Sequence, residues 1–104
     1  MLAEPVYPMI TDVLQPTLEN LLNEMKFKYT YKANEKKYII YWKNGKSSLI
    51  LRSAENWRRW AGLNLAAFGI DEAALLKDDN AWKMGISRLR DGYHLTGFTT
   101  TTPE

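Results

Sequence analysis

Residues 65–72 read LAAFGIDE, an uncharged run that ends in two adjacent carboxylates, Asp71 and Glu72. A short apolar run bounded by turn signals is typical of a buried strand. The two acids would then follow the carboxyl end of that strand, which is the edge where open α/β sheets bind ligands. At such an edge one carboxylate can hold a Mg²⁺ ion that bridges nucleotide phosphates, while its neighbour orients or deprotonates the attacking water.

The pattern by itself leaves two interpretations of this acidic pair. Neighbouring strand residues point to opposite faces of a sheet, so both acids can serve one site only if the backbone bends after the strand. Ala73 and Ala74 leave room for that bend. The alternative is that the acids simply open a helix, because acidic residues are favoured in first helical turns.

The composition is that of an ordinary globular protein, with 45% hydrophobic and 25% charged residues among 104. This length suffices for one domain or part of one. The absence of cysteine excludes a disulfide framework and a thiolate metal site, and it fits a reducing cytosol. The amino-terminal stretch MLAEPVYPMI has no basic region, and no apolar run approaches ~20 residues, so we expect neither a secretion signal nor a membrane span.

The periodicity of apolar residues predicts strands that alternate with helices, and such alternation favours an α/β fold with a parallel sheet. An antiparallel β-meander is expected as an insertion in that sheet or as an edge on it. A brief strand is expected within Leu2–Tyr7, followed by a helix that has Pro16 in its first turn or at a kink and an apolar stripe of Leu14, Leu18, Leu21, Leu22 and Met25. The meander over Lys26–Arg52 and a short helix over Ala54–Ala61 come next, before the central strand from Leu63 or Asn64 to Ile70. The remaining expected elements are a helical turn through Leu76, a helix capped at Asp78–Asn80 and stopped by Gly92, and a last strand over Tyr93–Thr102.

The stretch Lys43–Ser48, KNGKSS, contains GKS but does not match a phosphate-binding loop. That loop requires G-x-x-x-x-G-K-[ST], and Ile40 stands where the first glycine belongs. The loop must also lead into a helix, whereas Asn44-Gly45 is a strong hairpin signal between two strands. We therefore predict a hairpin turn here and no phosphate cradle within this sequence.

Basic residues concentrate between Lys26 and Arg59, where ten Lys and Arg residues stand against two glutamates. In the meander they alternate with aromatic residues, a combination that suits nucleic acid through base stacking and phosphate neutralisation. The favoured alternative is that the aromatic residues form the packed face of the sheet while the lysines protect an exposed face. The aromatic residues concerned are Tyr29, Tyr31, Tyr38, Tyr41 and Trp42.

Arg58 and Arg59 lie between Trp57 and Trp60 on the short helix before the central strand. One of these arginines could reach the nucleotide of a neighbouring subunit as an arginine finger. The slightly favoured alternative is a solvated face that the tryptophans anchor. His94 is the only histidine, and without a second histidine or a cysteine it supports neither a metal site nor a catalytic triad.

Thr99–Thr102 form a cluster of hydroxyl residues at the end of the last predicted strand. Threonine is common in strands, so the cluster can reflect ordinary propensity. If the last strand is a parallel neighbour of the central strand, however, these hydroxyls lie beside Asp71 and Glu72. Hydroxyls in that place can sense a γ-phosphate or its attacking water.

Taken in order, four segments resemble the large terminase subunit of tailed bacteriophages, the motor ATPase that packages DNA into the procapsid. The segments are AEPVYPMITD, NGKSSLILRSAENWRRWAGLNLAAFGIDEA, WKMGISRLR and GFTTTTPE. The resemblance runs from about Leu2 to Glu104 and implies a RecA-like ATPase core of the ASCE P-loop class. It assigns Asp71 as the Walker B aspartate on Mg²⁺, Glu72 as the catalytic glutamate, and Thr100, Thr101 and Thr102 as the coupling motif. Arg52 matches an arginine of the family's RSA element, to which we assign no role.

The sequence departs from the family pattern in two places. Ala61 precedes Gly62 where the family has arginine, so a trans-acting arginine from this region would have to be Arg58 or Arg59. The Walker A loop and the nuclease domain of the family are not matched. We therefore expect residues 1–104 to be an internal fragment of one terminase ATPase domain, a partial RecA-like sheet that lacks the Walker A loop and should not hydrolyse ATP by itself.

For the intact parent protein, the resemblance implies Mg²⁺ and ATP as cofactors and the cytoplasm of the bacterial host as location. It implies double-stranded DNA, the portal protein and the small terminase subunit as partners, a homo-oligomeric ring and no membrane association. The alternative function is that of a non-enzymatic nucleic-acid-binding module that uses the basic aromatic meander.

Overall fold

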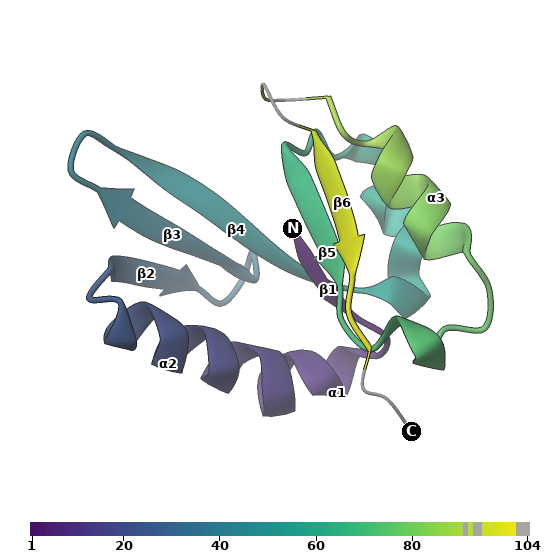
Figure 1. Cartoon of the computed structure of the whole chain (residues 1–104), viewed down its shortest axis with the longest axis horizontal. Helices are drawn as coiled ribbons and strands as arrows, with labels where there is room; N and C mark the ends of the chain where they lie inside the picture. The colour runs from purple at the N-terminus through teal and green to yellow at the C-terminus, as the bar shows by residue number, and fades with distance from the viewer. Residues whose placement is uncertain (91, 93–94, 102–104) are drawn as a thin grey trace.

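The computed structural model of the chain describes residues 1–90, 92 and 95–101. In this part of the chain six strands form one mixed sheet in the order β2-β3-β4-β1-β5-β6 (Figure 1). The strands are β1 (Leu2–Glu4), β2 (Lys28–Lys32), β3 (Lys37–Trp42), β4 (Gly45–Ser53), β5 (Ala67–Ile70) and β6 (Thr96–Thr99). The helical elements are α1 (Tyr7–Met9), the π-helical η1 (Ile10–Leu14), α2 (Gln15–Glu24), the 3-10 helices η2 (Ala54–Gly62) and η3 (Ala73–Leu75), and α3 (Asn80–Ser87).

Strand β4 joins the two halves of the sheet. Its first part pairs with β3 in antiparallel register, whereas its last three residues pair with β1 in parallel, so that Ser53 lies opposite Glu4. β1 also pairs in parallel with β5, and β5 pairs in parallel with β6. The carboxyl ends of β4, β1, β5 and β6 therefore share one edge. The expected α/β sheet is confirmed, and the meander extends it as an antiparallel edge.

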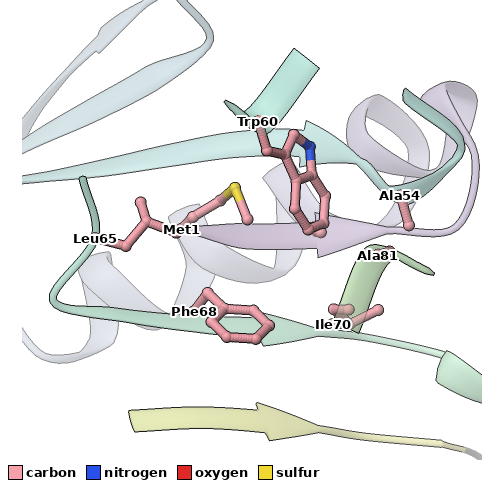
Figure 2. Packing of buried hydrophobic residues seen from close by; sticks show 8 residues of the cluster. Met1, Ala54, Trp60, Leu65, Phe68, Ile70 and Ala81 are labelled. Atoms are coloured by element: carbon pink, nitrogen blue, oxygen red, sulfur yellow. The ribbon is translucent and has the colours of Figure 1, made fainter. Parts of the chain in front are cut away.

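One hydrophobic core packs η2 and α3 against the face of the sheet that carries Phe68 and Ile70 (Figure 2). Trp60 of η2 is completely buried in this core, and Ala81 of α3 faces the same cluster. A small residue in α3 lets the helix come close to the sheet, while the indole fills the space beneath η2. Burying such aromatic and aliphatic side chains stabilises the fold by about 1.5–3 kcal/mol each.

A second core lies on the opposite face of the sheet, under α2 and η1. Ile10, Leu14 and Leu22 of the helical segment pack on Tyr38 and Leu51 of the meander strands. The predicted helix stripe is confirmed for Leu14, Leu18 and Leu22, which cover the meander, whereas Leu21 and Met25 are exposed. Within the described residues, no helix is long and apolar enough to span a bilayer.

The meander separates its aromatic and basic residues by face. Tyr29 and Tyr31 of β2 pack on the ring of Tyr38, with centroid distances of 5.7 and 4.6 Å. Lys28 and Lys32 alternate with them and are exposed. The packing interpretation is therefore confirmed for these three tyrosines. Tyr41 and Trp42, at the far end of the β3–β4 hairpin, remain 43% and 50% exposed.

The first helical segment changes its geometry along its length. It is α-helical over Tyr7–Met9, π-helical over Ile10–Leu14 and α-helical again from Gln15. Pro16 lies in the first turn of α2, as expected, directly after the π-helical stretch. Proline has no N–H to donate to the carbonyl four residues earlier, so the backbone there adopts another hydrogen-bond register.

Several predicted boundaries were wrong, each for a local reason. β1 ends at Glu4, before Pro5, and the chain is helical from Tyr7, so the predicted strand was too long. The central strand begins only at Ala67, because Leu65 forms an isolated parallel bridge with Leu89 instead. The last helix ends at Ser87, before Gly92, and the last strand is limited to Thr96–Thr99 in the described part of the chain.

Candidate functional site

The candidate site lies at the carboxyl edge of the parallel strands, where β5 ends at Ile70 (Figure 1). The backbone N–H of Asp71 donates to the carbonyl of Ala3 over 2.9 Å, and the N–H of Thr100 donates to the carbonyl of Ile70 over 2.9 Å. These bonds continue the β1–β5 and β5–β6 ladders by one step. They fix the backbone of Asp71 between the ends of β1 and β6.

The backbone turns sharply at Glu72, which adopts a left-handed conformation with φ 53° and ψ 44°. This residue is the N-cap of η3, and its carbonyl accepts a hydrogen bond from Leu75 N–H over 3.0 Å. A left-handed conformation costs a residue other than glycine roughly 1 kcal/mol. The bend that both carboxylates need in order to share one edge is therefore present. It is a turn after the strand and not the first turn of a long helix.

Thr100 contacts Asp71 directly. Its Oγ1 hydroxyl donates a hydrogen bond to Oδ1 of Asp71 over 2.6 Å. The contact joins residues that are 29 positions apart, and it exists because β5 and β6 are parallel neighbours in register, with Ile70 opposite Thr99. The expected proximity of the threonine cluster to Asp71 is thus observed for Thr100. Thr101 is exposed beyond it, while Thr102 and His94 lie outside the described residues.

Glu4 is a third acid at this edge, and the sequence analysis did not single it out. Its side chain is completely buried at the end of β1, and neither carboxyl oxygen has a partner of hydrogen-bonding geometry among the described residues. Burial, together with the nearby carboxyl groups of Asp71 and Glu72, raises the pKa of Glu4 to about 8. Glu4 is therefore neutral at pH 7 and can lie beside Asp71 without charge repulsion.

The pKa of Asp71 moves in the other direction. Burial alone would raise it, but the Thr100 hydroxyl, the Glu4 carboxyl and the backbone N–H of Glu72 stabilise the charged form and hold the pKa of Asp71 below 3.8. Two neighbouring acids whose pKa values are pushed apart are typical of functional sites. At neutral pH the ionised carboxylate of Asp71 therefore lies next to the protonated carboxyl of Glu4.

An ionised, half-exposed carboxylate suits a hard divalent cation such as Mg²⁺, which proteins bind through one or two carboxylates while water and phosphate oxygens complete the octahedron. The described residues contain no group of three or more His, Cys, Asp or Glu side chains placed to enclose a metal ion. A cation at Asp71 would therefore complete its coordination with water or phosphate oxygens. The arrangement fits a metal shared with a phosphate better than a structural metal.

The two candidate arginines of η2 occupy different surroundings. The guanidinium of Arg58 lies over the ring of Trp57, 4.4 Å from its centroid, which agrees with the tryptophan-anchored interpretation. Arg59 is exposed and lines a surface cavity together with Arg52. Arg52 is held by backbone carbonyls, since its Nη1 donates to Leu51 O over 2.7 Å and to Glu35 O over 3.2 Å.

Solved structures with this fold are large terminases. The large terminase of a thermophilic bacteriophage superposes with a TM-score of 0.78 at 16% identity, over 95% of this chain and 25% of that one. The complex of the same terminase with ADP gives 0.76 at 18% identity, again over 95% and 25%. The large terminase ATPase domain of Thermus phage P74-26 gives 0.63 at 15% identity, over 99% of this chain and 47% of that one.

The chain has the fold of a large terminase. At these identities the similarity establishes the fold, and the RecA-like arrangement that the resemblance implies is confirmed. The chain spans about a quarter of the first of these terminases and about half of the P74-26 ATPase domain. No protein-family model matches the sequence, and a search of curated proteins finds no significant match.

The missed acid had a local signal in the sequence. Glu4 stands in the apolar stretch LAEPV, directly before Pro5. A carboxylate at the end of a buried strand has the same relation to the sheet edge as Asp71 does. With the terminase fold in place, Glu4, Asp71 and Thr100 end three adjacent parallel strands, so the site is built across β1, β5 and β6.

Proposed function

We propose that the chain is part of the ATPase domain of a phage large terminase, which couples ATP hydrolysis to DNA translocation into the procapsid. The observation that carries this proposal is the hydrogen bond from Thr100 to Asp71 at the edge of a terminase-like sheet. It brings the proposed metal-binding acid into contact with the proposed coupling motif. The strand propensity of threonine, which could by itself explain the threonine cluster, does not explain why Thr100 contacts this acid.

In this proposal Asp71 holds Mg²⁺, in part through phosphate oxygens or water. The bound ion would neutralise charge on the transferring phosphate. Asp71 is suited to the task because its lowered pKa keeps it ionised, and because the Thr100 hydroxyl orients its carboxylate through Oδ1. Protonated Glu4 would support Asp71 without adding a second negative charge.

Glu72 is the proposed general base that orients and deprotonates the attacking water. In a regular strand Glu72 would point to the opposite face of the sheet from Asp71. Its left-handed backbone conformation ends the strand geometry at this residue, so this alternation does not apply to it. Thr100, Thr101 and Thr102 would report the state of the γ-phosphate, Thr100 through its bond to Asp71. Arg58 and Arg59 remain the candidates for an arginine that acts on the neighbouring subunit's nucleotide.

The phosphate-binding half of the site is proposed to lie outside this chain, because the 104 residues contain no G-x-x-x-x-G-K-[ST] loop. The terminase of the thermophilic bacteriophage has been observed in complex with ADP and with ATP-gamma-S, which supports ATP as the nucleotide of the parent protein. Double-stranded DNA, the portal protein and the small terminase subunit are the proposed partners. A homo-oligomeric ring in the cytoplasm of the bacterial host is the proposed assembly.

The test is MgATP hydrolysis by the purified chain and by a longer product of the same reading frame that carries a phosphate-binding loop. The chain itself should show no turnover, and the longer product should. In the longer product Glu72→Gln should lower kcat by a factor of about 10²–10⁴, as expected for loss of a general base. Glu24→Gln, at the exposed end of α2, is the matched control and should leave kcat unchanged.

Two results would contradict the proposal. One is appreciable turnover by the 104-residue chain that Glu72→Gln abolishes, because the chain would then need no phosphate-binding half from outside. The other is a longer product whose hydrolysis does not depend on Asp71 or Glu72.

A second candidate function, nucleic-acid binding by the meander alone, is supported by the exposed face of β2 and by the hairpin end. Lys28 and Lys32 are exposed on one side, and Tyr41 and Trp42 are the exposed aromatic residues of the hairpin. Both rings are already engaged, since Tyr41 pairs with the Thr30 hydroxyl and Trp42 packs edge-on against Phe27. This function predicts salt-dependent DNA binding that weakens in Tyr41→Ala and is unaffected by Asp71→Asn.

A further inference from the structure

A surface cavity of about 320 Å³ lies at the carboxyl end of β4, separate from the Asp71 site. Four segments line it: the start of the first helical segment, the β2–β3 turn, the end of β4 and η2. The residues that matter most for its chemistry are Tyr7 from the first helical segment, Glu35 and Lys36 from the β2–β3 turn, Arg52 from β4 and Arg59 from η2. The cavity is thus built from parts of the chain that only the fold brings together.

The charge in this cavity is predominantly positive. Lys36, Arg52 and Arg59 supply three cations, and Glu35 is the only acid in its lining. The carboxylate of Glu35 forms an ion pair with Lys37 over 3.3 Å, and Lys37 lies outside the lining. Among the described residues none of the three cavity cations has an ion-pair partner. The cavity therefore has unneutralised positive charge.

Two of the cations are held in place by the fold. Arg52 donates through Nη1 to two backbone carbonyls, which leaves the N–H groups of its other nitrogens for a ligand. Lys36 has a left-handed backbone with φ 51°, and its ammonium group lies 4.6 Å from the centroid of the Tyr7 ring. A left-handed lysine is uncommon and is maintained only when its surroundings determine it.

We infer that this cavity binds a phosphate group carried by an organic moiety, either a nucleotide or the backbone of a nucleic acid. Arg and Lys donors that converge from three segments match the several oxygens of a phosphate. The volume is at the lower end of the range for small-molecule sites and exceeds what a bare phosphate needs. Ile10, Leu51 and Trp60 are buried beneath the lining, and the ring of Tyr7, which is 43% exposed, is the apolar surface available to a sugar or base.

The location of the cavity separates this role from that of Asp71. Arg52 and Ser53 end β4, and Asp71 follows β5, with β1 between the two strands. Two strand spacings correspond to about 10 Å along the sheet edge. The same edge thus has a cationic cavity at one end and carboxylates at the other. A phosphate bound in the cavity needs no metal, whereas one beside Asp71 does.

The test is a nitrogen–proton NMR titration of the 104-residue chain, without divalent cations, using inorganic phosphate, adenosine monophosphate and a short DNA duplex. Saturable shifts should centre on the amides of Lys36 and of Arg52–Arg59. Arg59→Gln should weaken binding about tenfold, as expected for a charge-assisted contact. Lys77→Gln is the matched control: it removes one positive charge from an exposed residue that does not line the cavity, and should weaken binding less than about twofold.

The arms of the titration distinguish the two sources of phosphate. Tighter binding of the monophosphate than of the duplex identifies a nucleotide site. Tighter binding of the duplex, with an affinity that falls linearly on a log scale with salt, identifies a backbone site. Lys36→Gln should weaken whichever ligand binds, and thermal melting of each variant separates loss of a contact from loss of the fold.

Three results would overturn the inference. Equal weakening by Lys77→Gln and Arg59→Gln would mean that the binding is diffuse electrostatic attraction. Shifts confined to the β3–β4 hairpin end around Tyr41 and Trp42, or to the Asp71 edge, would place the ligand elsewhere. An absence of saturable shifts at millimolar phosphate ester would mean that the cavity is not a phosphate site.

Discussion

The hydroxyl of Thr100 donates to the Oδ1 atom of Asp71 over 2.6 Å, and this bond connects the ends of two parallel strands that are far apart in the sequence. It orients the Asp71 carboxylate from the β6 side, while the buried Glu4 flanks it from the β1 side. A change at Thr100 therefore acts on Asp71 directly. This physical contact gives the sheet edge a means of transmitting a change at Asp71 to β6.

Thr100→Val should raise the pKa of Asp71, because it removes the hydroxyl that stabilises the carboxylate. Glu4 and the backbone N–H of Glu72 continue to lower the pKa, so only part of the shift is lost. Stability should fall by about 1 kcal/mol or less, since the bond is exposed to solvent. A carbon NMR titration of the Asp71 side-chain carboxyl measures the change. Thr100→Ser keeps the hydroxyl, and an equal rise in that variant would show that the bond does not control Asp71.

Glu4 should make the protein less stable as the pH rises through neutrality. In the folded chain its carboxyl keeps its proton up to about pH 8, whereas in the unfolded chain it releases it near pH 4.5. Between these values the folded state binds more protons, so the free energy of unfolding decreases with pH. The contribution of Glu4 is complete below pH 4.5 and is lost by about pH 8. Asp71, whose pKa is lowered, acts in the opposite sense but only below pH 3.8.

Glu4→Gln should abolish this decline, because a carboxamide stays neutral at every pH in the window. Below pH 4.5 the variant and the parent should be similar in stability, and near pH 8 the variant should be the more stable. Urea unfolding without divalent cations, measured across that range, gives the comparison. Glu24→Gln, on the exposed surface of α2, should keep the parent's decline. A parent whose stability does not fall between these pH values would contradict the assignment.

The alternation of Tyr29 and Tyr31 with lysines was enough to predict the meander, because a period of two has no helical interpretation. The ends of the parallel strands were not predictable in the same way. An apolar run shows that a segment is buried, but the length of its ladder depends on its partners. β1 has only three residues before Pro5, so it offers a short ladder to its neighbours. Leu65 lies too early in the chain to pair with β1 and forms a bridge with Leu89 instead, so β5 is shorter than its apolar run.

The candidate site was partly predictable for a similar reason. Asp71 and Glu72 were identified locally, and the proximity of Thr100 followed from the assumption that the last two strands are parallel neighbours. Glu4 has a local signal as an acid at the end of an apolar stretch, but its place beside Asp71 could not be predicted, because that depends on β1 lying between β4 and β5 in the sheet. That strand order results from pairings between residues about 50 and 70 positions apart, such as Glu4 with Ser53 and Ala3 with Ile70. No local pattern encodes it.

Lys26→Gly should stabilise the protein by up to about 1 kcal/mol. Lys26 follows α2 in a left-handed conformation with φ 60°, and its N–H donates to Asn23 O while Phe27 N–H donates to Leu22 O. These two bonds define a Schellman motif, in which glycine is the preferred residue at this position. Thermal or urea unfolding measures the gain. Lys26→Ala removes the same charge but retains the Cβ atom, so it should show no such gain; equal gains would point to charge instead of backbone strain.

Gly85→Ala should destabilise the protein by about 1–2 kcal/mol, although alanine is the better helix former by about 1 kcal/mol. A Cβ atom at Gly85 in α3 would overlap the ring of Phe68, which is 1% exposed and belongs to the core cluster shown in Figure 2. Gly69→Ala is the informative comparison, because its Cβ atom would meet the ring of Phe98, which is 45% exposed and can turn outward. Urea unfolding should therefore show a larger loss for Gly85→Ala than for Gly69→Ala. A Gly85→Ala variant more stable than the parent would mean that α3 can move away from the sheet, and that Phe68 does not fix their separation.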